Sequence, residues 1–376
     1  MRNHQTPGAY ARLLALAGVV CGMTIVSSPV AAQRSDTTSS RDSIGRRRIQ
    51  PLPAIASAPE TGLQYGATVF AVWEPAAVLK TRPSTLTASA LRTAKAQSRI
   101  RLEGEHWTRD NALRLSGSIQ WQEFPLPYYG IGDNTPKTAE ETFTPRGTEV
   151  ILMLQERIAR SWYVSAGARH VEQRITTDSA GTLGANTVPG SRGGTISEWS
   201  TGIMTDTRDN LFAPRSGNWV QLTYARSMNG IWSDYSYGTM RLDARSYHAI
   251  ANDHVLAMQV QITNIDGTAP FDQLALAGSS DILRGYARGR YRDRAMAAVQ
   301  AEYRSPIRHR LGAVAFLGAG SVAPALDAIA SHRLLPSYGA GLRVEIDHRQ
   351  RSGVRLDYGR GRDGASGLYI GFNNAF

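Results

Sequence analysis

The chain has 376 residues, of which 42% are hydrophobic, and its 42 basic and 31 acidic residues give a formal net charge of +11. Its single cysteine, Cys21, excludes an internal disulfide framework and a thiolate metal site. The basic residues, nearly all arginine, are scattered singly through strand-like segments. This scatter argues against nucleic-acid binding, which needs a concentrated basic surface.

The first 32 residues have the three parts of a cleavable secretory signal. Basic residues precede an apolar run over residues 13–26, and small residues follow as far as Ala32. The run is shorter than the ~20 apolar residues of a membrane-spanning helix. We therefore expect residues 1–32 to be a signal peptide. Residues 33–49, rich in Ser, Thr, Asp and Arg, are expected to form a flexible periplasmic leader.

From residue 50 to residue 376 one pattern repeats. About ten residues of alternating apolar and polar side chains are followed by Gly, Asn, Asp, Ser or Pro, which predicts β-strands with two different faces. The predicted strands cover residues 50–58, 60–74, 83–94, 97–107, 111–122, 146–157, 160–173, 194–206, 217–227, 234–247, 252–264, 294–304, 309–320, 337–347, 351–360 and 366–376.

Three features favour a transmembrane barrel over a soluble sandwich. The polar faces carry bulky ions such as Arg343 and Asp357, which can pair and hydrate in a wet lumen. Trp and Tyr lie near strand ends, where interfacial girdles require them, and the strands have the ~9–11 residues that a tilted membrane strand needs. We therefore predict an all-β fold, a closed antiparallel barrel whose even strand number leaves no exposed edge.

The end of the chain carries a further signal. Phe376 is the last residue, and it follows a strand that places Leu368, Ile370 and Phe372 on one face. A terminal aromatic residue on an alternating last strand is what the outer-membrane assembly machinery recognises. We therefore expect these four residues to form the assembly signal of a barrel in the bacterial outer membrane.

Several segments, in a fixed order, resemble the barrel of the BamA/TamA-type outer-membrane proteins, the bacterial surface antigen family. One segment is Leu283-Arg284-Gly285-Tyr286, which lies in the long connection before the strand that contains Glu302. A mid-barrel hairpin pattern precedes it, made of Asp206, Arg208, Asp209, Pro214 and Gly217. The resemblance covers roughly residues 51–376.

The resemblance implies that the loop between strands eleven and twelve folds back into the lumen. A guanidinium held there is only partly hydrated and needs carboxylate or aromatic partners, and the expected partners of Arg284 are Glu302, Asp357 and Glu345. Gly285 lets the backbone turn tightly, and the Tyr286 ring can pack against the wall. Gly318 stands where the family usually has an Asp, so one partner known from the family is missing.

The resemblance also implies a function. It predicts a barrel that assists the assembly or translocation of outer-membrane components, in contact with outer-membrane lipid and with unfolded outer-membrane clients. A weakly paired seam between the first and last strands would open, and Gly367 and Gly371 weaken the last strand. Because residues 33–49 are too few for a POTRA docking domain, we expect a short branch that lacks these domains. The alternative is a passive, anion-preferring pore or a structural barrel.

Catalytic patterns were sought as a third possibility. The histidines that follow the signal fit neither a Ser/His/Asp arrangement nor a zinc-binding spacing. The glycine-rich stretches lie between strands and lead into no helix, so they do not predict a phosphate site. We expect no enzyme activity, no metal and no cofactor.

Overall fold

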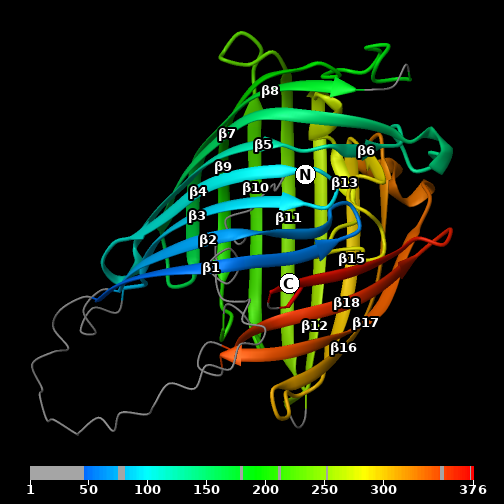
Figure 1. Ribbon diagram of the computed structural model, residues 1–376. Helices are drawn as coiled ribbons and strands as arrows, with labels where there is room; N and C mark the ends of the chain where they lie inside the picture. Colours follow the sequence, from blue (N-terminus) through cyan, green and yellow to red (C-terminus); the bar gives the residue numbers. More distant parts are fainter. Residues whose placement is uncertain are drawn as a thin grey trace, which may run out of the picture.

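The computed structural model describes residues 46–74, 81–177, 181–210, 213–250, 253–347, 351–372 and 374–376 (Figure 1). The expected signal peptide and residues 33–45 of the expected leader lie outside these ranges. The last four leader residues belong to the first strand, which begins at Arg46 and not at residue 50. The barrel therefore starts slightly earlier than the sequence pattern predicted.

Sixteen strands form one closed ring, as predicted, and each pairs antiparallel with its neighbours. They are β1 (Arg46–Ala58), β2 (Gly62–Glu74), β3 (Ser84–Thr93), β4 (Ser98–Trp107), β5 (Leu113–Glu123), β7 (Glu141–Arg157), β8 (Trp162–Thr177), β9 (Gly193–Asp206), β10 (Gly217–Ser227), β11 (Ser236–Ala249), β12 (Val255–Thr268), β15 (Ala295–Arg304), β16 (Leu311–Ala323), β17 (Leu335–Asp347), β18 (Ser352–Gly361) and β19 (Ser366–Phe372).

The connections contain the remaining short elements. Among the residues that the structure describes in full, these are β6 (Leu126–Tyr128), which pairs with β7, the two-stranded sheet of β13 (Ala275–Ala277) and β14 (Tyr291–Asp293), and four 3₁₀ turns at Arg109–Asn111, Lys137–Ala139, Phe271–Gln273 and Leu326–Ser331. Within the described ranges, no helix is long and apolar enough to cross a membrane.

The two faces of the strands are arranged as a membrane barrel requires. On β5, the Leu115 side chain is 53% exposed on the outer surface, whereas the neighbouring Ser116 is 2% exposed and points inward. The same inversion holds on β17 and β18, where Leu342 is exposed while Arg343 and Asp357 are buried. The apolar face is therefore the lipid face, and the polar face lines the lumen.

The two ends of the barrel differ in the length of their connections. The first strand begins and the last strand ends at the same end, where the described turns 158–161 and 305–310 are short. The opposite end carries longer connections such as residues 129–140. Short turns are typical of the periplasmic side and long loops of the extracellular side. We therefore assign the end with both termini to the periplasm.

The largest core of the molecule lies inside the ring and not between layers. The connection from β12 to β15, residues 269–294, supplies Ile282, Leu283 and Tyr286, which are buried among inward-facing wall residues such as Val322 and Leu335. Apolar burial against the inner wall stabilises this loop inside the lumen, and it brings the loop arginines to the ionic face of the strands.

Candidate functional site

The tip of the inserted loop is a tight turn that needs glycine. Leu283 has φ of +52° and Gly285 has φ of +112°. A Cβ atom on Gly285 would lie 2.6 Å from the backbone of Arg360 in β18, closer than real Cβ contacts come. The Ser279 hydroxyl accepts the backbone N–H groups of Asp281 and Ile282, which fixes the start of the turn. This local geometry directs the Arg284 side chain toward the wall.

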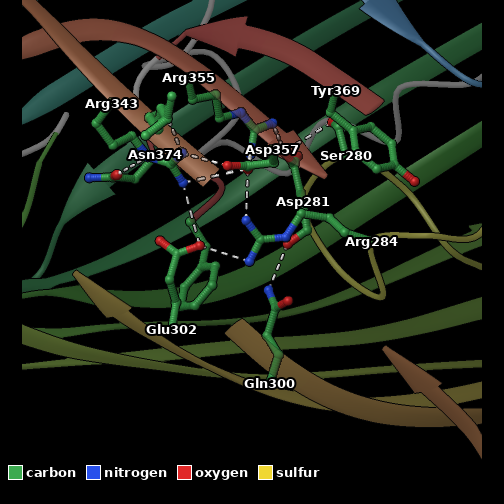
Figure 2. A network of polar contacts seen from close by, with 12 residues as sticks. Ser280, Asp281, Arg284, Gln300, Glu302, Arg343, Arg355, Asp357, Tyr369 and Asn374 are labelled. Atoms are coloured by element: carbon green, nitrogen blue, oxygen red, sulfur yellow. Dashed lines mark hydrogen bonds and ion pairs between the residues drawn. The ribbon is translucent and has the colours of Figure 1, made fainter. Parts of the chain in front are cut away.

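Arg284 is fully buried between two carboxylates (Figure 2). Its Nη2 lies 2.7 Å from Oε2 of Glu302 on β15, and its Nη1 lies 2.8 Å from Oδ2 of Asp357 on β18. The guanidinium carbon lies 3.5 Å from the ring centroid of Phe316 on β16. A planar guanidinium can bind two carboxylates and an aromatic face together, which a lysine cannot reproduce.

Further arginines surround the same carboxylates (Figure 2). Glu302 also accepts from Arg304, at 2.8 Å, and lies 3.5 Å from Arg343. Asp357 pairs with Arg343 as well, and Arg355 lies 3.5 Å from it. We call Arg284, Glu302, Arg304, Arg343, Arg355 and Asp357 the arginine cluster. Each carboxylate is shared by three arginines, so the cluster tolerates the charge that burial would otherwise penalise.

Backbone contacts hold the loop against the last strands. Ser337 on β17 donates to the carbonyl oxygen of Arg284 at 2.6 Å. The hydroxyl of Tyr369 on β19 accepts the N–H of Gly285 at 2.9 Å and donates to the carbonyl of Tyr286 at 3.2 Å. The Tyr286 hydroxyl donates to the Pro336 carbonyl at 2.8 Å, and burial raises the pKa of this phenol, so it stays protonated.

Inward-facing glycines on β17 and β18 make room for the loop. A Cβ on Gly359 would lie 2.7 Å from the Arg284 carbonyl carbon, and one on Gly361 would lie 2.4 Å from the Tyr286 ring. A Cβ on Gly341 would lie 2.0 Å from Oδ1 of Asp357. Gly359 and Gly361 therefore admit no side chain unless the loop moves away from the wall, and Gly341 admits none unless Asp357 on the wall itself shifts.

We expect Gly359→Ala to displace the loop and to lower the free energy of unfolding by about 1–3 kcal/mol, the usual cost of overpacking. The lipid-facing Gly104→Ala is the matched control, because its nearest neighbour is the flexible Leu86 side chain at 3.3 Å. Urea unfolding of both variants in vesicles measures the difference. Equal stabilities would show that the loop does not depend on this close approach.

Comparisons with known proteins agree with this architecture. A family model described as the Omp85 superfamily domain matches residues 87–371, which is most of the chain. The chain belongs to the Omp85 superfamily. Barrels of this superfamily lie in the outer membrane, where they contact its lipid, and they are typically assembly or transport proteins. A comparison with curated protein sequences gave no significant match.

Two solved structures share the fold of this Omp85 barrel. BamA from Haemophilus ducreyi lacking POTRA domains 1-3 is 15% identical with a TM-score of 0.60, and the alignment covers 88% of this chain and 70% of that one. CdiB from Acinetobacter baumannii is 13% identical with a TM-score of 0.56, and the alignment covers 88% of this chain and 66% of that one. At these identities the likeness concerns the fold.

The structure brings Arg284 together with Glu302 and Asp357, two of its three expected partners, but not with Glu345. That expectation was wrong because Arg343 occupies the inward position of β17 beside the cluster. Glu345 lies two residues further along the strand, where it lines a cavity of about 210 Å³ near the periplasmic turns. At Gly318, where the family has an Asp, a Cβ would lie 2.9 Å from the Gln300 side chain.

The hairpin motif forms the turn between β9 and β10. Arg208 pairs with Asp206 at 2.9 Å, and Asp209 accepts the backbone N–H groups of Arg215 and Ser216. Gly217 has φ of +95° and closes the turn. The Pro214 carbonyl accepts a hydrogen bond from Arg304 at 3.4 Å. The hairpin therefore borders the arginine cluster without contributing a charge to it.

The end of the chain differs from the expected strand 366–376. The last strand ends at Phe372, whose side chain lies outside those that the structure describes, and only Leu368 of the expected signal is strongly exposed. The Phe376 side chain is buried in the lumen beside Tyr247 and Ala257. Arg304 donates to the Phe376 carbonyl oxygen at 2.7 Å, which holds the end of the chain inside the lumen. A role of these residues in assembly remains a prediction.

Several contacts of the cluster and the loop were not predicted, and the pairing of Arg304 with Glu302 is one of them. Phe316, Ser337 and Tyr369 contact the loop, and Asp281 pairs with Arg355 at 3.1 Å. Strand alternation could have placed the first three on inward faces, because they share parity with known inward residues. Which of the many inward residues the loop reaches depends on its path through the lumen. Among the described residues, no group of His, Cys, Asp or Glu is placed to hold a metal ion.

Proposed function

We propose that this Omp85 barrel assists the assembly or translocation of other outer-membrane components, and that unfolded clients engage it at the seam between β1 and β19. The observation that carries this proposal is the weakness of that seam. Within the described residues, β1 and β19 pair only at Ser57 and Ile370, whereas β1 and β2 pair along the whole of β1. Because a backbone hydrogen bond contributes only about 1 kcal/mol net, so short a pairing opens at low cost.

The arginine cluster would support such an opening. The inserted loop is tied to β17 through Ser337 and to β19 through Tyr369. These contacts brace the β19 side of the seam independently of β1. The seam can therefore separate while the loop and the last strands stay together, which suggests a positioning role for Arg284 and not direct contact with a client.

A second candidate function, an anion-preferring pore, has its own observation. Within the described residues, Nε and Nη2 of Arg99 are buried without a hydrogen-bond partner, and Nε of Arg241 donates to the Thr263 hydroxyl at a long 3.5 Å. Cations of this kind in a lumen favour anions. The loop 269–294 occupies the same lumen and opposes a wide conducting path.

The folding rate of a small unfolded barrel client, measured in lipid vesicles with and without this protein embedded, tests the proposal. We expect the embedded protein to accelerate client folding. The protein's own folding is monitored in the same vesicles by its resistance to protease. No acceleration by fully folded protein would overturn the proposal and leave the pore or structural barrel.

A further inference from the structure

The edge of β1 that faces the seam is identified by its hydrogen bonds. The carbonyl of Leu63 accepts from the N–H of Ala94, so the odd-numbered residues of β2 point toward β3 and its even-numbered residues toward β1. In the β1–β2 register, even residues lie opposite even residues, as Ala56 lies opposite Gln64. The odd-numbered residues of β1 therefore direct their N–H and C=O groups at the seam.

Prolines occupy this edge at alternating positions. Pro51 and Pro53 lie in β1, and Pro59 follows directly after it, all with odd numbers. A proline has no N–H group, so none of the three can donate to a neighbouring strand. In the described part of the seam, Ser57, which lies between Pro53 and Pro59, is the only residue of β1 that pairs with β19. Of the seven odd-numbered residues from Arg47 to Pro59, three are prolines, so the edge offers an unbroken row of carbonyl acceptors but lacks three of its seven donors.

The register explains where β19 stops. Continuing the antiparallel pairing of Ser57 with Ile370 would set Asn374 opposite Pro53 and Phe376 opposite Pro51. Instead, these tail residues turn into the lumen, where Asn374 accepts from Arg343 at 2.9 Å and the Phe376 carbonyl accepts from Arg304. The tail leaves the wall where β1 can no longer supply donors.

The opposite edge of the seam has no such defect. The N–H of Gly361 donates to the carbonyl of Ala365, so odd residues face each other across β18 and β19. The even residues of β19 therefore point toward β1. They are Ser366, Leu368, Ile370 and Phe372, and each has an N–H group. A strand added to β19 could form both main-chain hydrogen bonds of each residue pair. A strand added to β1 could form only one of the two bonds opposite each proline, because a proline accepts but cannot donate.

We infer that Pro51, Pro53 and Pro59 determine which edge of the open seam takes a β-strand, so that a client strand adds to β19 and not to β1. The inference rests on the proposed function, because a client must first enter the seam. Its physical basis does not depend on the client, since strand addition draws its affinity from main-chain hydrogen bonds. Each missing donor weakens pairing with β1.

Photo-crosslinking to an arrested client tests the polarity of strand addition. A photoreactive residue replaces Ile49 of β1 or Leu368 of β19, both exposed on the lipid face. We expect roughly tenfold more client adduct from position 368 than from position 49, because two or more hydrogen bonds separate the edges. The double variant Pro51→Val and Pro53→Val should remove most of this preference. Pro83→Val, which is far from the seam in sequence, serves as the control and should leave the preference unchanged. Predominant adducts from position 49 in the unchanged protein would overturn the inference.

A second measurement needs no client and separates the two proposals. A labelled peptide with the sequence of residues 366–376 is titrated onto the embedded barrel. We expect the Pro51→Val and Pro53→Val double variant to bind it at least about tenfold more tightly than the unchanged protein does. Equal binding, or binding to neither, would overturn the role of the prolines. If client folding is not accelerated but the double variant gains peptide affinity, the proposed function fails and the proline inference stands.

Discussion

Replacing Arg284 with alanine is expected to lower the free energy of unfolding by about 3–5 kcal/mol, the usual consequence of removing one partner from a buried ion pair. The substitution leaves Glu302 and Asp357 buried with one cation fewer, and it removes the stacking on Phe316. The remaining arginines keep both carboxylates partly paired, so we expect the barrel itself to fold. The loop tip should detach, because its ionic anchor is lost.

Urea unfolding in vesicles and limited proteolysis of residues 269–294 measure the two effects. Arg284→Lys keeps the charge but not the planar fork, so an intermediate loss is expected. Arg160→Ala, at an exposed turn position, removes the same charge outside the lumen and should change neither readout. If Arg284→Ala matched the stability of Arg160→Ala, the cluster would not hold the loop. Client folding should slow with Arg284→Ala, because the brace on β19 is lost.

A disulfide across the seam is expected to abolish client folding activity. Opposed residues of antiparallel strands have Cα atoms about 4.5–5.5 Å apart, which suits a disulfide, so Ser57→Cys with Ile370→Cys should cross-link. If the seam must open, the oxidised protein should fold the client no faster than protein-free vesicles do. Reduction should restore the original rate.

The matched control places the same bond at a junction that is continuously paired. Ala166 of β8 lies opposite Thr201 of β9, and Ala166→Cys with Thr201→Cys should leave the client folding rate unchanged in both redox states. An oxidised seam variant with full activity would exclude opening between β1 and β19 as part of the mechanism. The lumen would then be the next candidate site for contact with a client.

Local sequence features predicted the wall of the barrel well. Alternation with period two assigns each side chain to a face, because successive strand residues point to opposite sides. It therefore predicted sixteen strands, the lipid face of Leu115 and the inward position of Asp357, all of which the structure has. The alternating prolines were an equally local signal that the pattern of apolar residues obscured. Pro51 and Pro53 predict a poor pairing edge by the same logic.

What the sequence by itself determined is thus the set of strands, their two faces and the need for glycine at the loop tip. Only the tertiary structure decided that Arg284 meets Glu302 and Asp357 but not Glu345, and that Phe376 turns inward to Arg304. The physical reason is the range of the interactions. Alternation and turn chemistry act between neighbours in the chain. Contacts across a lumen depend on the stagger of the closed ring and on the path of a loop, which all sixteen strands set together.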